Sequence, residues 1–166
     1  MNKEINSTRL KKHYRSQEVT LLVLMILALP LFGVVYLYYN SGNLHWNLPE
    51  IPDFFKGLLA GLGYGVLMGQ YFIFRDTLKK ARQEEDFEEK IIFFLDASKK
   101  RFFYLFGISL ISTVGLLFYQ TAWFIILFAL TLVFFSLAKV SPERTKRLLR
   151  LSKEEGEILR LISRPD

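Results

Sequence analysis

The residues best suited to chemistry are five carboxylates that lie close together in the sequence: Glu84, Glu85, Asp86, Glu88 and Glu89. Carboxylates four residues apart on a helix could share a divalent cation. Three basic residues, Lys79, Lys80 and Arg82, lie just upstream, and nothing in the stretch supplies the loop geometry that calcium sites need. We therefore expect a solvated helix with balanced charge and no metal site.

Other reactive side chains are few. The chain has no cysteine, and its two histidines, His13 and His45, lie in different segments, too few for a familiar histidine metal site. His45 and Glu50 share one polar stretch, which we interpret as an ordinary solvent-facing loop. The sequence predicts no catalytic residue, no cofactor and no metal, and hence a protein that is not an enzyme. An enzyme with its chemistry in the acidic stretch is the weakest alternative.

The side chains described above must be positioned by four apolar segments, which predict an all-α integral membrane protein. Hydrophobic residues make up 51% of the 166 residues, and the charges are segregated between apolar blocks. Residues 19–39 contain no charge and would form a helix roughly 31 Å long, enough to cross a bilayer. This run is too long for a signal peptide and has no small-residue cleavage site after it, so we expect it to remain as a span.

The apolar stretch 102–138 is too long for one span. As a single helix it would measure roughly 55 Å, against a hydrocarbon core of about 30 Å. We predict a turn at residues 119–122, although that stretch lacks glycine and proline. The predicted spans are therefore residues 19–39, 54–74, 102–119 and 121–138, which pair into two hairpins, 19–74 and 102–138.

The distribution of basic residues predicts the orientation of these spans. Five basic residues precede the first span, eight lie at residues 75–101 and eight at 139–166, while Lys56 is the single one near the outer end. Because cytoplasmic segments carry the excess of Lys and Arg, we expect both termini in the cytoplasm. Residues 1–18 would then be a basic cytoplasmic segment, and residues 40–53 an outer loop. We expect a bacterial plasma membrane, with an anionic inner leaflet as the lipid partner.

Residues 75–101 predict a charged cytoplasmic linker. Lys80 and Glu84, Arg82 and Asp86, and Asp86 and Lys90 are each four residues apart, so we expect the second span to continue outward as a helix. Further along, one apolar face should lie on the bilayer surface or on another cytosolic segment; it is formed by Phe87, Ile91, Phe94 and Leu95.

Glycines give the second span its most specific pattern. Gly57, Gly61, Gly65 and Gly69 recur every four residues and form a groove without side chains on one helix face. Such a groove lets another helix approach closely, whether within this chain or from another copy or protein. Two other series of small residues predict further packing seams: Ala122, Ala129 and Ser136 in the fourth span, and Ser109, Ser112 and Gly115 in the third.

Transport chemistry has little support in the spans. They contain no Asp, Glu, His or Arg, and ionisable residues at depth usually mark transport pathways. The hydroxyls of the third span have no base nearby, so we expect them to bond to the backbone of their own helix or to a neighbouring helix. A passive pore in an oligomer remains open, and it would be lined by Tyr64, Gln70 and Tyr71.

The basic tail, residues 139–166, predicts two short amphipathic helices. Ser141 precedes a proline and a glutamate, as an N-cap does, and Ser152 with Glu155 forms a capping box. Residues 151–162, LSKEEGEILRLI, resemble the first helix of LuxR-type helix-turn-helix domains. The sequence ends before a recognition helix, so we expect no nucleic-acid partner.

The function that these patterns favour is a non-enzymatic membrane subunit or scaffold that packs through the glycine-lined second span. Its expected partners are further copies of itself, as a homo-oligomer, or another membrane protein. A small oligomeric channel or permease is the alternative.

Overall fold

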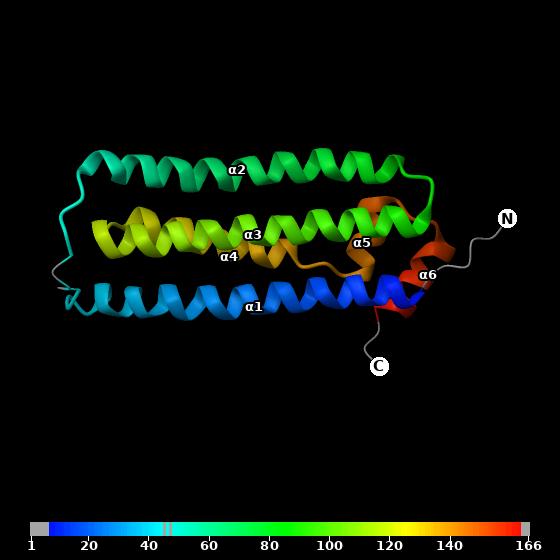
Figure 1. The fold of residues 1–166 in the computed structure, drawn as a ribbon, viewed down its shortest axis with the longest axis horizontal. Helices are drawn as coiled ribbons and strands as arrows, with labels where there is room; N and C mark the ends of the chain where they lie inside the picture. Colours follow the sequence, from blue (N-terminus) through cyan, green and yellow to red (C-terminus); the bar gives the residue numbers. More distant parts are fainter. Residues whose placement is uncertain (1–6, 45, 47, 164–166) are drawn as a thin grey trace.

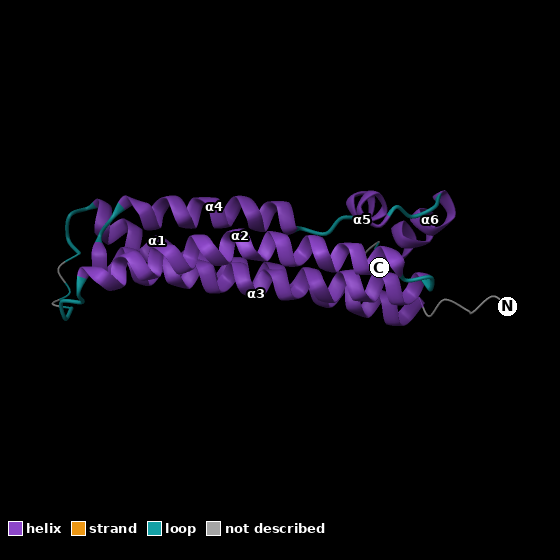
Figure 2. Ribbon diagram, turned by 90° about the horizontal axis from the view of Figure 1, so that it is seen from above, coloured by secondary structure: helices purple, strands orange, loops and turns teal. Residues whose placement is uncertain are grey.

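The computed structural model describes residues 7–44, 46 and 48–163, and it folds them into helices without a strand. Three long helices lie side by side, α4 covers one half of them, and α5 and α6 lie at the other end (Figures 1 and 2). The elements are α1 Ser7–Asn40, α2 Asp53–Gln83, α3 Phe87–Tyr119, α4 Ala122–Ala138, α5 Pro142–Leu149 and α6 Lys153–Ile162.

Three or four of these helices are candidates for membrane spans. Helices α1, α2 and α3 are each long and apolar enough to cross a bilayer. Helix α4 has 17 residues and reaches the required length only together with α5, from which it is bent by 83°. Large apolar side chains point outward over the long helices, including Ile26, Leu37, Phe54 and Met68. An apolar outer surface of this extent suits contact with lipid rather than water.

The chain reverses direction between α3 and α4 at Gln120 and Thr121, where the sequence predicts a turn. Gln120 adopts the left-handed conformation that ends many helices, with φ +49°, and its N–H donates to the Leu116 carbonyl at 3.0 Å. The turn is tied to the loop at the same end, because Gln120 Nε2 donates to the Leu44 carbonyl at 3.2 Å. These bonds allow a residue other than glycine to make the turn.

The charged stretch 75–101 is divided between the end of α2 and the start of α3. Helix α2 does continue past the apolar segment, and it ends at Gln83. Arg82 and Asp86 therefore do not lie on one helix, whereas the Lys90 N–H donates to the Asp86 carbonyl at 2.9 Å at the start of α3. Helix α3 begins at Phe87 and runs unbroken to Tyr119. Asp86 separates the two helices as the N-cap of α3, and its Oδ2 accepts from the Glu89 N–H at 3.4 Å.

Two hydrophobic cores follow one another along the bundle. The bundle core joins α1, α2, α3 and α4 and includes Leu24, Leu67, Phe102, Leu127 and Phe135. The end core joins the charged ends of the three long helices to α5 and α6, and consists of Leu10, Tyr14, Leu78, Ala81, Ile91, Phe94, Leu95, Val140, Leu149, Leu151, Leu159 and Ile162. The amphipathic face of residues 87–95 therefore packs on other segments of the chain, while the cytosolic location of those segments stays a prediction.

Polar contacts fix the tail helices on this end core. Arg82 Nε donates to the Leu148 carbonyl at 2.7 Å, and Leu148 lies in the last turn of α5, where helix carbonyls lack helical partners. The predicted caps are confirmed: Ser141 accepts from the Arg144 N–H, and Ser152 and Glu155 form a capping box. Because α5 and α6 pack on the end core, the first and last described residues of the chain lie on the same side of the molecule (Figure 1).

Helix α3 is the central element of the bundle core, and small residues let its neighbours approach. Ser109 and Ser112 are buried, and their hydroxyls donate to backbone carbonyls of the same helix at 2.7 and 2.9 Å. A Cβ at Gly115 would collide with the Phe124 ring of α4. The predicted small-residue seam of this helix is thus a packing surface within the chain.

This contact gives a test of the α3–α4 packing. Replacing Gly115 by Ala should lower the free energy of unfolding by about 1–3 kcal/mol, because the Phe124 ring must move. Thermal unfolding of the detergent-solubilised protein should show a lower Tm. Gly107→Ala on the same helix is the control, since a Cβ there meets no atom within 4 Å. Equal Tm values for the two variants would contradict the packing described.

Candidate functional site

The glycine series of α2 faces away from the rest of the fold. A Cβ added at Gly57, Gly61, Gly65 or Gly69 would meet no atom within 4 Å. The glycine of α2 that packs internally is Gly63, where an added Cβ would lie 2.5 Å from Leu127 Cδ2 of α4. The four-residue series is therefore not used for packing within the chain, and a contact with another chain stays a prediction. We call this surface the glycine face.

The predicted seam of α4 also points outward. Ala122, Ala129 and Ser136 are all exposed. Helix α4 instead packs inward through larger side chains, namely Phe124, Leu127, Phe128, Thr131 and Phe135. A packing role for the three small residues would likewise require a helix from another chain.

The three residues predicted to line a pore do not share one space within the chain. The Tyr64 hydroxyl donates to the Trp123 carbonyl at 3.0 Å and joins α2 to α4. Gln70 is buried between α2 and α3, whereas Tyr71 is about half exposed on the outer surface. Any lining role would need a different arrangement in an oligomer.

Gln70 contacts Arg101 of α3, a residue that the sequence alone did not single out. Its side chain is buried, with 7% of the residue exposed, and its Nε donates to Gln70 Oε1 at 2.7 Å. The guanidinium carbon lies 4.9 Å from the centre of the Phe74 ring. Gln70 is itself held in place, because its Nε2 donates to the Leu67 carbonyl at 3.1 Å.

The positive charge of Arg101 is incompletely compensated. Among the residues that the structure describes, no carboxylate lies within 4.0 Å of it, and Arg144 is close enough to repel it. Burying a cation costs several kcal/mol after relaxation. One hydrogen bond to a neutral amide and one contact with an aromatic ring offset part of that cost.

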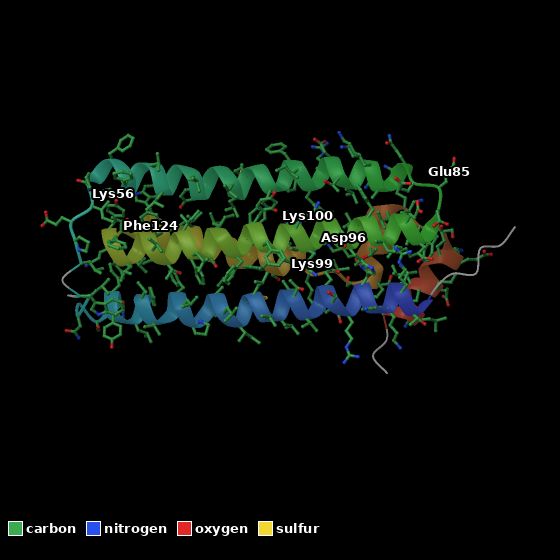
Figure 3. All side chains as sticks on the ribbon, in the orientation of Figure 1. Lys56, Glu85, Asp96, Lys99, Lys100 and Phe124 are labelled. Atoms are coloured by element: carbon green, nitrogen blue, oxygen red, sulfur yellow. The ribbon has the colours of Figure 1, made fainter. Side chains whose placement is uncertain are left out.

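A cavity of about 400 Å³ opens beside Arg101 between α2 and α3, and we call it the α2–α3 groove. Its apolar wall is formed by Ile73, Phe74 and Phe93, and three cationic side chains line it with a single carboxylate. The polar and charged lining residues are Gln70, Thr77, Lys80, Asp96, Lys100, Arg101 and Tyr104. Figure 3 shows Lys100 on the side of α3 that faces α2, and Lys99 on the side that faces α1.

A second cavity of about 390 Å³ lies between α1 and α3. Gln17 lines it and is 2% exposed, yet neither its amide nitrogen nor its amide oxygen has a hydrogen-bond partner. Leaving such a group unpaired costs about 1–3 kcal/mol. The other polar groups that line this space are Arg9, Lys12, His13, Ser16, Asp96 and Lys99.

The acidic group has a structural role at the helix start. Glu84 and Glu85 lie in the break after α2, and Asp86 caps α3, with Glu88 and Glu89 in its first turn. Negative charge is favourable at a helix N-terminus. Across residues 7–44, 46 and 48–163, no cluster of three His, Cys, Asp or Glu side chains could hold a metal ion. His45 lies outside the described residues, and Glu50 is exposed.

Comparison of the chain with protein families, with curated proteins and with solved structures finds no match.

The Gln70–Arg101 contact predicts a specific loss of stability. Gln70→Leu should lower the free energy of unfolding by about 1–3 kcal/mol, since it removes the one acceptor of a buried cation. The Tm of the solubilised protein measures this loss. Gln83→Leu, at an exposed position of the same helix, is the matched control. If the two variants unfold at the same temperature, the contact contributes nothing to the packing of α2 on α3.

Proposed function

We propose that this protein is a non-enzymatic membrane scaffold or subunit whose glycine face binds a transmembrane helix from another chain. The observation that carries the proposal is the outward orientation of Gly57, Gly61, Gly65 and Gly69, where a Cβ added to any of the four would have no atom of the fold within 4 Å. In a bilayer, such a surface allows two helix backbones to approach closely, and van der Waals contact then stabilises the pair.

The position of α2 in the bundle supports this role. Helix α2 packs mainly on α3, through a single face that includes Gly63, Leu67, Gln70, Leu78 and Ala81. Its remaining surface stays free along much of the helix. Another helix can therefore dock there without displacing any part of the fold.

A second copy of this chain is the simplest occupant. A two-fold axis brings the same patch of both subunits together, and two grooves of equal depth are complementary to each other. The outward series Ala122, Ala129 and Ser136 offers a further small-residue surface for a larger assembly.

We further propose four spans in a bacterial plasma membrane, with both termini in the cytoplasm. The support is the charge distribution, since basic residues concentrate in the segments that form or flank the end core. In this orientation the end core and the tail helices lie in the cytoplasm, where they present a soluble surface to partner proteins. Basic residues near the membrane surface would favour an anionic inner leaflet by about 1 kcal/mol each.

The mass of the protein in nanodiscs or mild detergent tests the glycine face. We expect a discrete homo-oligomer for the natural sequence. The double variant Gly61→Leu with Gly65→Leu should weaken association about tenfold, which corresponds to about 1.4 kcal/mol, because the leucines hold the helices apart.

The matched control is Gly33→Leu with Gly107→Leu, at two glycines on other helices where an added Cβ also meets nothing within 4 Å. This control should keep the natural mass. Co-purification of a different membrane protein, lost in the Gly61 and Gly65 variant alone, would assign the face to a subunit contact instead. An unchanged mass and composition in both double variants would refute the proposal.

A further inference from the structure

We propose that the α2–α3 groove is a binding site for a phosphate-bearing anion, which Arg101, Lys80 and Lys100 hold from two helices. This inference goes beyond the scaffold role and does not rest on the glycine face, which lies on another side of α2. It rests on the composition of the groove and on the buried charge beside it.

The buried side chain of Arg101 is the strongest evidence for an anion site. A guanidinium has five N–H donors in a planar fork, and its Nε–H is bonded to Gln70. The hydrogen bonds of the described residues leave the other N–H groups without a protein acceptor. Two oxygens of a phosphate match the spacing of such a fork and would neutralise the buried charge. Gln70 and Phe74 fix the position of the guanidinium, so little side-chain freedom remains to be lost on binding.

The two lysines supply charge from opposite sides of the groove, Lys80 from α2 and Lys100 from α3. Neither lysine forms an ion pair within the part of the chain that the structure describes. The one carboxylate in the lining is Asp96, whose Oδ1 lies 3.9 Å from His13 Nδ1 of α1. Three cations thus face one carboxylate, and an anion entering the groove meets a net positive charge.

The location of the groove points to a lipid as the carrier of the phosphate. It lies where α2 and α3 change from apolar to charged sequence, near Phe74 and Arg75 on one helix and Arg101 and Phe102 on the other. Ile73, Phe74 and Phe93 form its apolar wall, beside which acyl chains could continue along the exposed surface of the helices. Basic pockets between spans on the cytoplasmic side bind anionic headgroups in this manner. Free phosphate has the same chemistry, so the experiment separates the two sources.

Native mass spectrometry of the full chain gives the first readout, with phosphatidylglycerol or phosphatidylcholine added to the micelles in equal amounts. We expect the natural sequence to retain one phosphatidylglycerol in preference to phosphatidylcholine. Lys80→Gln with Lys100→Gln should weaken that binding by about fivefold for each lysine removed. These two exposed residues make no described contact within the fold, so the variant should fold normally.

The control is Lys79→Gln with Lys153→Gln, which removes the same charge at exposed positions outside the groove. Lipid retention should be unchanged in this control. Inorganic phosphate is then titrated while the Tm is followed. A rise in Tm with phosphate, absent in the Lys80 and Lys100 variant and not matched by the lipid, would assign the site to a free phosphate.

Two outcomes would overturn the inference. One is equal retention of both lipids together with no response to phosphate. The other is an equal loss of binding in the two double variants, which would mean that overall surface charge, and not the groove, attracts the anion.

Discussion

The buried guanidinium of Arg101 sets the constraint on which the charged half of the molecule depends. A cation at this position must find hydrogen-bond acceptors, because burial without them costs several kcal/mol. Gln70 supplies one, and the two residues together fix the register of α2 against α3. The α2–α3 groove lies beside that polar contact, and Gln70 and Arg101 both line it. The packing of α2 on α3, the polar contact between them and the proposed ligand site therefore all involve the Gln70–Arg101 hydrogen bond.

A second constraint is that the long apolar helices carry charged extensions at one end only. Helices α1, α2 and α3 continue past the bundle core, and their extended ends pack with α5 and α6 around the end core. Tyr14 and Arg82 reinforce this packing by donating to the carbonyls of Val140 and Leu148. The two halves suit two solvents: lipid around the apolar helices, and water around the charged end. A single chain can thus hold a charged surface against helices that are apolar enough to span a membrane.

Much of this architecture is encoded in local patterns. Apolar length predicts the long helices, the caps at Ser141 and Ser152 predict the tail helices, and the need to fold back predicts the turn at Gln120. The full extent of α3 does not follow from these patterns, because the dense charge of the stretch 75–101 suggests a boundary with the apolar run after it. A helix crosses such a boundary readily when its charged end has its own core to pack on.

The candidate sites were harder to predict, since they depend on which face each helix turns inward. Glycine spacing identifies the groove of α2 but does not say that Gly63 faces α4 while the four-residue series faces outward. Arg101 does carry a signal in the sequence. It lies three and four residues from Ser98 and Leu105, which are both buried on the inner face of α3. That spacing places a charge inside the bundle, but Gln70 as its partner emerges only when α2 and α3 are packed together.

The most direct test of the account is the side of the membrane on which the tail lies, because four spans place the tail with the N-terminus and three spans place it opposite. The chain has no cysteine, so single cysteines at exposed sites report accessibility without interference. In intact cells, a membrane-impermeant maleimide should label Ser41→Cys in the outer loop. It should label Ser152→Cys only after the membrane is permeabilised. Labelling of Ser152→Cys in intact cells would contradict the four-span arrangement and the cytoplasmic end core.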